Sequence, residues 1–214
     1  MADNWLVVDV ETVAIDGYAD FVEAAEAPSN YKDPVKIAEY VKAETEKRAN
    51  KAALDLDLAR IVCLGWCNVS GWLCSIATTE DDEREMLKDF AARFSGHQMI
   101  TFAGYGYDLP LLARRYLYLG LPVPFGLMNH DVYRTNHVDL WWLLSQRGKG
   151  SAHKLSWYAK RLGWQDVLNR DPLEAGGAAV AKALSEGRTQ DIADHNGCDL
   201  ELTKRLARWM GVIP

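Results

Sequence analysis

Residues 5–12 (WLVVDVET) form an apolar run that is interrupted by two acids, Asp9 and Glu11. A short apolar run bounded by polar residues predicts a buried strand, and side chains alternate between the two faces of a strand, so both acids lie on one face. Two unpaired carboxylates at the end of a buried strand are costly unless a cation neutralises them. The run therefore predicts either a cation site at a strand end or a strand that simply ends at Asp9, with both acids in solvent.

The overall composition is that of one globular domain with a full core. The 214 residues are 49% hydrophobic and 25% charged, and we expect a single domain over residues 1–214. No apolar run approaches the roughly 20 residues of a membrane-spanning helix, and the N-terminus has no basic and apolar leader. These features predict a cytoplasmic protein with no membrane partner.

The net charge and the cysteines further restrict the class of protein. A net charge of −6 disfavours a protein that coats nucleic acid, because such a protein needs clustered Lys and Arg, but it is compatible with a local basic track beside an acidic site. The cysteines show neither Cys-x-x-Cys spacing nor a histidine at zinc-finger spacing, so we expect reduced thiols in the core. They are Cys63, Cys67, Cys74 and Cys198.

A long segment without strand character, residues 15–58, follows the first strand. Asp33 as N-cap and Pro34 at the first helical position predict a helix over residues 34–53. Its interleaved charges indicate a solvated helix, so we interpret the segment as a helical insertion within the domain. Beyond it, two apolar runs flank a turn at residues 68–71 and predict an antiparallel hairpin. The runs are residues 60–67 and 72–76.

Strands and helices then alternate along the chain. Thr79 opens a helix that ends near Gly96, with an apolar stripe. Gly120 and Gly163 end two later helices. The expected elements are a strand at 98–102, a helix beginning near Leu111, a strand near 137–140, and helices at 154–162, 173–186 and 190–210, and the stripe is Met86, Leu87, Phe90 and Phe94. A hairpin followed by this alternation predicts an α/β domain with a mixed β-sheet flanked by helices.

Asp108 lies in the loop between the strand at 98–102 and the helix that follows it. In α/β units ligands collect at the carboxyl ends of strands, and Gly104 and Gly106 allow close backbone approach there. Taken alone, Asp108 is better explained as the N-cap of the helix, and the two roles are compatible. Asp139 is likewise expected to be a helix N-cap first and an additional acid second.

The last predicted helix carries one continuous stripe with spacings of 3, 4, 3, 4 and 3 residues, which places its members on one buried face. The stripe is Ile192, His195, Asp199, Leu202, Leu206 and Trp209. An inward Asp one turn from an inward His requires a partner. His195 alone is also compatible with a hydrogen-bonded core histidine, whereas Asp199 has no comparable structural explanation.

Taken together, the four acids and the histidine resemble the DEDD superfamily of 3′-5′ exonucleases, which has the ribonuclease H-like fold. Within it, the chain is most similar to stand-alone exonucleases that resemble the proofreading domain of family-B DNA polymerases. Residues 9–12 (DVET) resemble the first motif, residues 101–110 (TFAGYGYDLP) the second, and residues 195–203 (HNGCDLELT) the third. Residues 138–140 and 154–163 are similar to the segment that joins the second motif to the third.

Two positions depart from the family pattern. Ala103 stands where the family usually has Asn, which removes a hydrogen-bonding side chain. His195 stands where the related branch has Tyr four residues before the last Asp; another branch has His, but five residues before it. The metal-binding acids are intact, so the departures concern the general base.

The resemblance implies a site for two divalent ions, Mg²⁺ or Mn²⁺, which prefer oxygen ligands. It implies that Asp9, Glu11 and Asp199 hold the catalytic ion, that Asp9 and Asp108 hold the second, and that His195 orients or deprotonates the water. It also implies that the backbone at Thr12 and Val13 cradles the terminal nucleotide. Phosphate contacts would come from Lys149 and Lys154, although a solvated helix face explains these lysines equally well.

The function implied is metal-dependent hydrolysis of phosphodiester bonds from the 3′ end of single-stranded nucleic acid, with DNA as the expected substrate and nucleoside monophosphates as products. Two alternatives stay open. The same fold could serve as a catalytically weakened nucleic-acid or protein-binding module, or the enzyme could be a 3′-5′ exoribonuclease, because residues that read the 2′-hydroxyl cannot be placed from sequence. The oligomeric state is also open.

Overall fold

A computed structural model describes residues 4–94, 97–124, 127, 136–173 and 177–214, and it is built around a five-stranded sheet in the order β3-β2-β1-β4-β5. β1 (Trp5–Ala14) is the central strand. The hairpin of β2 (Ala59–Asn68) and β3 (Gly71–Ile76) lies on one side of it, and β4 (Gln98–Thr101) and β5 (His137–Asp139) lie on the other. β1 pairs antiparallel with β2 and parallel with β4. The predicted mixed sheet is confirmed.

The central strand has two different edges. β2 follows it from Val7 to Ala14, with a register shift between Glu11 and Thr12. On the opposite edge β4 pairs only with residues 5–7. Among the described residues, residues 8–14 of β1 therefore have no strand partner on the β4 side, and this part of the strand carries Asp9 and Glu11.

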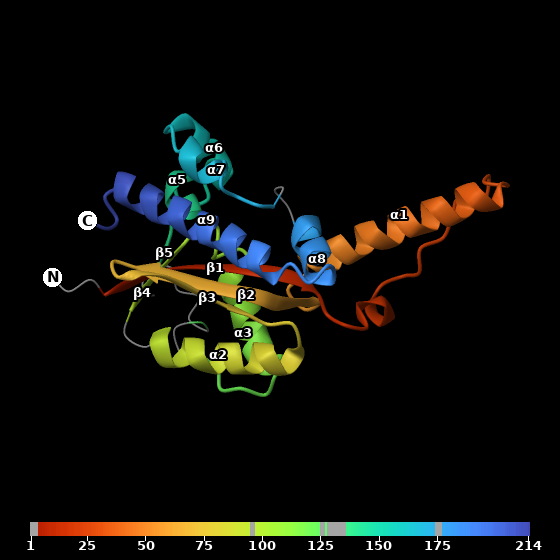
Figure 1. Cartoon of the computed structure of the whole chain (residues 1–214), viewed down its shortest axis with the longest axis horizontal. Coiled ribbons are helices and arrows are strands. Elements are labelled where there is room, and N and C mark those ends of the chain that lie inside the picture. Colours follow the sequence, from red (N-terminus) through yellow and green to blue (C-terminus); the bar gives the residue numbers. More distant parts are fainter. Residues whose placement is uncertain (1–3, 95–96, 125–126, 128–135, 174–176) are drawn as a thin grey trace.

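Helices cover both faces of the sheet (Figure 1). α2 (Glu80–Phe94) and α3 (Asp108–Tyr118) lie on one face, and α8 (Gly177–Ser185) and α9 (Thr189–Trp209) lie on the other. The alternation of β1 follows this division. Leu6, Val8 and Val10 pack with the α2 and α3 side chains, whereas Trp5 and Val7 pack with α9 side chains. Asp9 and Glu11 continue the odd-numbered series, so they face α9.

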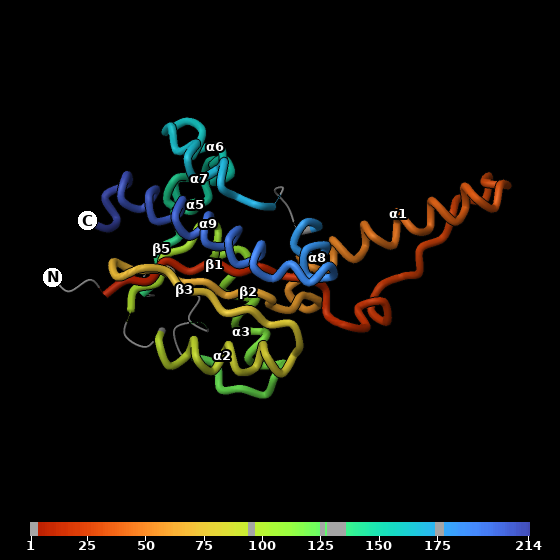
Figure 2. Tube along the Cα trace, in the orientation of Figure 1, coloured from red at the N-terminus to blue at the C-terminus, as the bar shows by residue number. Residues whose placement is uncertain are grey.

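The insertion after β1 consists of a short 3-10 helix, η1 (Tyr18–Phe21), and α1 (Pro34–Ala52). The Asp33 carboxylate accepts a hydrogen bond from the Val35 backbone N–H at 2.9 Å, which confirms the predicted N-cap. Figures 1 and 2 show α1 extending away from the sheet. Ala52 is its one buried residue, so the helix has little core of its own.

α2 and α3 are joined by a buried ion pair. α2 begins as predicted, because the Thr79 hydroxyl accepts a hydrogen bond from the Asp82 N–H at 3.1 Å. Within it, the fully buried Glu83 receives two hydrogen bonds of 2.8 Å from Arg115 of α3. Glu83 also accepts the Ile61 N–H of β2 at 2.9 Å. One carboxylate thus connects both helices to the sheet. The expected helix end near Gly96 lies outside the described residues.

The remaining helices largely follow the prediction. α5 (Leu140–Leu144) and α6 (Leu155–Arg161) come after β5, and α7 (Gln165–Leu168) is a short helix that the sequence pattern did not indicate. Gly163, with φ of +78°, ends α6 as expected. α8 begins later than the predicted residue 173, and residues 174–176 lie outside the described part. α9 matches its prediction within one residue at each end.

The cysteines are free thiols, with Cys63, Cys67 and Cys198 buried and Cys74 half-buried, as predicted. Within the described residues, every helix is too short or too polar to span a lipid bilayer.

Candidate active site

Asp9 and Glu11 project from β1 toward the α9 face of the sheet, as the strand alternation predicts. The Asn196 side chain of α9 donates a hydrogen bond of 2.8 Å from Nδ2 to Asp9 Oδ2. Asn196 is fully buried. Glu11 lies opposite His195, with 3.8 Å between Glu11 Oε1 and His195 Nε2. The first pair of acids is therefore held against one helix.

α9 supplies the second part of the site. His195 and Asp199 lie one helical turn apart, and Glu11, His195 and Asp199 each offer one ligand atom within 4.8 Å of the others. The inward position predicted for His195 is correct, since it is 8% exposed. The prediction is wrong for Trp209, which is 58% exposed, because it is the last residue of α9 and the chain leaves the helix there.

Asp108 is the first residue of α3 and is buried. The expectation that it caps the helix is wrong: Tyr107 holds the N-cap position, and no side chain caps it. The Asp108 carboxylate therefore makes no capping hydrogen bond to the start of α3. Burial, followed by the charge of Asp139, raises the pKa of Asp108 to about 7. The charge of Asp108 also contributes to raising the pKa of Asp9, which brings the third segment into the same cluster.

The four acids destabilise each other's ionised forms. Burial, and then the charge of Glu11, raises the pKa of Asp9 well above its ordinary value. Burial raises the pKa of Glu11 to about 8 even though His195 opposes the change. Burial likewise raises the pKa of Asp199 to about 6. A divalent cation would relieve the cost of ionising these clustered carboxylates, and their oxygen atoms suit a hard divalent ion.

Asp139 has a structural role. Its carboxylate accepts backbone N–H groups from Ala103 and Tyr105, both at 2.9 Å, and from Trp142 at 3.1 Å. The bond to Trp142 confirms the predicted N-cap of α5. The other two bonds fix the loop between β4 and α3, in which Ala103 has a φ of +66°. Asp139 thus holds the loop that carries Asp108 and has few lone pairs left for a metal ion.

Sequence reasoning missed two residues of this site, Asp171 and Asn196. Asp171 follows α7, and both of its carboxylate oxygens lie within hydrogen-bonding distance of His195 Nδ1, at 2.7 and 2.9 Å. Burial lowers the pKa of His195, but Glu11, Asp199 and Asp171 together raise it above its ordinary value. No periodic pattern marked Asp171. Asn196 could have been noticed as a polar residue beside an inward His.

The residues expected to contact substrate divide into two groups. Thr12 and Val13 are buried, and the Thr12 hydroxyl donates to the Ala53 carbonyl at 2.7 Å and lies 3.0 Å from the Tyr107 hydroxyl. Their side chains are thus occupied, and only their backbone is available at the open edge of β1. Lys149 and Lys154 are exposed on the segment between α5 and α6.

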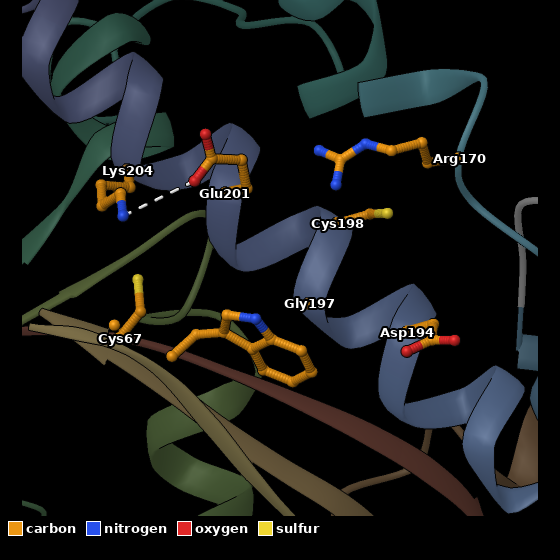
Figure 3. Close-up of a pocket in the computed structure, with 9 residues that line it drawn as sticks. Cys67, Arg170, Asp194, Gly197, Cys198, Glu201 and Lys204 are labelled. Carbon is orange, nitrogen blue, oxygen red and sulfur yellow. Dashed lines mark ion pairs between the residues drawn. The ribbon is translucent and has the colours of Figure 1, made fainter. Parts of the chain in front are cut away.

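A separate hollow of about 470 Å³ lies beside α9 (Figure 3). Trp72 of the edge strand β3 lines it and packs against Gly197 of α9, where an added Cβ would lie 3.4 Å from the Trp72 ring. Lys204 pairs with Glu201 at 3.6 Å. The other labelled residues that line it are Cys67, Arg170, Asp194, Gly197 and Cys198. None of the four acids lines this hollow, so it is distinct from the acid cluster.

The fold and the acid cluster together define a ribonuclease H-like α/β domain. The structure is similar to that of the family B DNA polymerase from the hyperthermophilic archaeon Pyrobaculum calidifontis, with a TM-score of 0.59 and 18% sequence identity. The match covers 96% of this chain and 24% of the polymerase chain, so the chain spans about a quarter of the polymerase's length. At this identity the likeness shows the fold alone. No curated protein sequence matches the chain.

The family assignment comes from residues 54–204, which match a family described as predicted 3′-5′ exonucleases related to the exonuclease domain of PolB. Since the match covers more than half of the chain, the chain belongs to this family. The matched residues begin after β1 and α1. Asp108, His195 and Asp199 lie inside the match, whereas Asp9 and Glu11 join them through the fold.

Proposed function

We propose that this protein is a metal-dependent exonuclease that shortens single-stranded nucleic acid from its 3′ end, with DNA as the substrate and nucleoside monophosphates as the products. The observation that carries the proposal is the convergence of four carboxylates from β1, α3 and α9, of which Asp108 is buried and the others are half-buried, all with raised pKa values. A structural core gains nothing from such mutual repulsion, whereas a divalent cation relieves it.

In this proposal Asp9, Glu11 and Asp199 hold one divalent ion, and Asp9 and Asp108 hold the second. The ions would be Mg²⁺ or Mn²⁺, because the ligands are carboxylate oxygens. When bound, such ions supply water activation and neutralise the charge that develops on the leaving oxygen. Asn196 keeps the shared ligand Asp9 in place through its hydrogen bond of 2.8 Å.

His195 serves as the general base in this proposal. Its Nε2 atom is directed at the acid cluster and lies 3.8 Å from Glu11 Oε1. A neutral imidazole in this position accepts a proton from the attacking water. The ring is inside the cluster and only 8% exposed, so a water held between the acids and the ring is shielded from bulk solvent.

The strand of substrate would enter along the open edge of β1. The backbone at Thr12 and Val13 would hold the terminal nucleotide, and the exposed Lys149 and Lys154 would contact phosphates upstream. Next to Lys154, His153 and Trp157 form a stacked pair with ring centroids 4.0 Å apart. Trp157 is 43% exposed, so its free face could stack on a base.

The decisive experiment uses 5′-labelled single-stranded DNA and RNA of the same sequence, each with Mg²⁺, with Mn²⁺ and with EDTA. We expect stepwise shortening of DNA from the 3′ end that stops in EDTA. Preference for RNA would assign an exoribonuclease. Absence of hydrolysis with every ion would favour a binding module.

A closed circular single strand is the control for direction. The proposal expects no cleavage of the circle, because an exonuclease of this kind requires a free 3′ end. Fragments from the circle would show endonuclease activity and would contradict the assignment.

A further inference from the structure

His195, the proposed general base, contacts a carboxylate, Asp171, to which the proposed function assigns no role. His195 presents its two ring nitrogens to different surroundings. Nε2 is directed toward Glu11 and Asp199. Nδ1 lies 2.7 and 2.9 Å from the two carboxylate oxygens of Asp171, which comes from a different segment of the chain. A single carboxylate thus faces the one nitrogen that does not point into the acid cluster.

Asp171 is itself held in place. The backbone N–H of Leu173 donates to Asp171 Oδ1 at 3.0 Å, and the buried Leu173 packs in the apolar cluster around Val180 and Ile192. The Asp171 side chain is 19% exposed, so solvent only partly competes for its oxygens. The carboxylate therefore has a fixed direction rather than that of a free surface acid.

The chemical consequence concerns which nitrogen carries the proton. A carboxylate can only accept, so Nδ1 must donate to Asp171. In the neutral ring the lone pair is then on Nε2, and the hydrogen bond also fixes the ring plane. A ring without this partner could rotate, or could place its proton on Nε2, and either change would remove the acceptor from the acid cluster.

We infer that Asp171 is a positioning residue for His195, holding the ring with its Nε2 lone pair directed between Glu11 and Asp199 for proton acceptance. The inference rests on the proposed function, because it assigns Asp171 a role in the same hydrolysis. Asp171 acts only through His195, so its contribution should disappear when the ring is removed.

A double-mutant cycle measures this dependence. Asp171→Ala should lower kcat by about 10- to 100-fold with little change in KM, since substrate contacts are untouched. In a His195→Ala background, the same substitution should cause no further loss. Asp171→Asn, which keeps an acceptor for Leu173 and His195, should fall between the wild type and Asp171→Ala, and it serves as the readout if Asp171→Ala does not fold.

Asp166→Ala is the matched control. Asp166 also reaches α9, through two hydrogen bonds of 2.9 Å from Arg205, but it does not approach His195. This variant should retain the wild-type kcat. A second readout is the Nδ1–H proton of His195 in ¹⁵N-edited NMR of the metal-free protein, which should be protected in the wild type and in Asp166→Ala and lost in Asp171→Ala.

The outcomes separate the two proposals. A wild type that hydrolyses no nucleic acid overturns the proposed function, and the NMR signal still tests the contact between Asp171 and the ring. If the wild type hydrolyses nucleic acid, three results would overturn the role of Asp171 alone. The first is that the losses in kcat from the Asp171 and His195 substitutions add, and the second is that Asp171→Ala stays within about threefold of wild type. The third is that the substitution leaves the Nδ1–H signal unchanged.

Discussion

Gly65 of β2 lies directly opposite Asp9 in the antiparallel pairing of β1 and β2. The absence of a side chain at Gly65 leaves the space that the Asn196 amide of α9 occupies. A Cβ at this position would overlap Asn196 Oδ1 and approach Leu200 Cδ1 to 2.8 Å. The glycine therefore allows α9 to lie close enough to the sheet for Asn196 to reach Asp9.

The substitution Gly65→Ala tests this packing. We expect a loss of about 1–3 kcal/mol in the free energy of unfolding, because an added methyl group overpacks a fully buried contact. Displacement of Asn196 should also release Asp9 and weaken hydrolysis. Chemical denaturation and the exonuclease assay measure the two effects. Gly150→Ala is the control for stability, since its Cβ comes no closer than 3.4 Å to a neighbour. Equal stability of the two variants would contradict the packing argument.

Divalent ions should stabilise the folded protein through the four acids. At an ion concentration 100 times the dissociation constant, one bound ion adds about 2.7 kcal/mol to the free energy of unfolding. Thermal unfolding with Mn²⁺ should therefore show a raised Tm in the wild type and a much smaller rise in Asp199→Asn, which should also abolish hydrolysis. The exposed Asp20 provides the matched control, and Asp20→Asn should behave as wild type. An equal Mn²⁺ effect in Asp199→Asn would rule out Asp199 as a ligand.

The metal-free protein should lose stability as the pH rises from 6 to 9. The pKa values of Asp199, Asp108 and Glu11 are raised to about 6, 7 and 8 in the folded state. A carboxyl group with a raised folded pKa contributes its full stability below its unfolded pKa, near 4, and this stability is lost as the pH rises from there through the folded pKa. One unit of pKa corresponds to about 1.4 kcal/mol.

Thermal unfolding in EDTA measures this dependence, and we expect the Tm to fall by roughly 5 °C or more over the range. Burial lowers the pKa of His137 to about 3, so this residue destabilises the fold only as the pH falls below about 6.5, the ordinary pKa of histidine, and it affects only the acidic end of the range. Glu11→Gln should flatten the profile. A Tm that stays constant in the wild type would contradict the clustering of the acids.

His195→Ala should reduce the rate by about 10²–10⁴-fold if the ring accepts the proton. Wild-type activity should fall as the pH decreases and the ring becomes protonated. His195→Tyr should recover part of the loss and shift activity to higher pH, because a phenol titrates near 10 and an imidazole near 6.5. Rates across a pH series measure both effects. An alanine variant within a few-fold of wild type at every pH would restrict His195 to a packing role.

Breaking the buried ion pair between Glu83 and Arg115 should cause a large loss of folding stability. Arg115→Met leaves Glu83 without its two hydrogen bonds in a site with no solvent access. We expect a loss of about 3–5 kcal/mol in the free energy of unfolding, measured by urea denaturation. The double variant Arg115→Met with Glu83→Leu should regain much of that loss. A single variant as stable as wild type would show that the pair has no net stabilising effect.

The sequence alone predicted which way a side chain faces wherever one short-range pattern determined it. The alternation in β1 placed Asp9 and Glu11 on one face, and the period of α9 turned His195 and Asp199 inward. It was insufficient where the partner was distant. Asp171 lies in an irregular segment, and only the packing of that segment against α9 brings it to His195.

Helix ends show the same limit. Trp209 satisfies the spacing of the α9 stripe, but a stripe carries no information about where the helix and its packing end. The N-cap expected of Asp108 failed for a related reason. The loop before α3 is fixed by Asp139, which lies 31 positions further along the chain and reaches back to Ala103 and Tyr105.

The acids of the site come from β1, α3 and α9, three elements that the ribosome produces at widely separated times. A nascent chain that has completed β1 and α3 holds Asp9, Glu11 and Asp108 but lacks Asp199 and the proposed base. Under the proposed function, such a chain cannot yet hydrolyse a phosphodiester bond. Hydrolytic activity during synthesis would thus report the docking of α9, which makes the enzyme its own probe of complete folding.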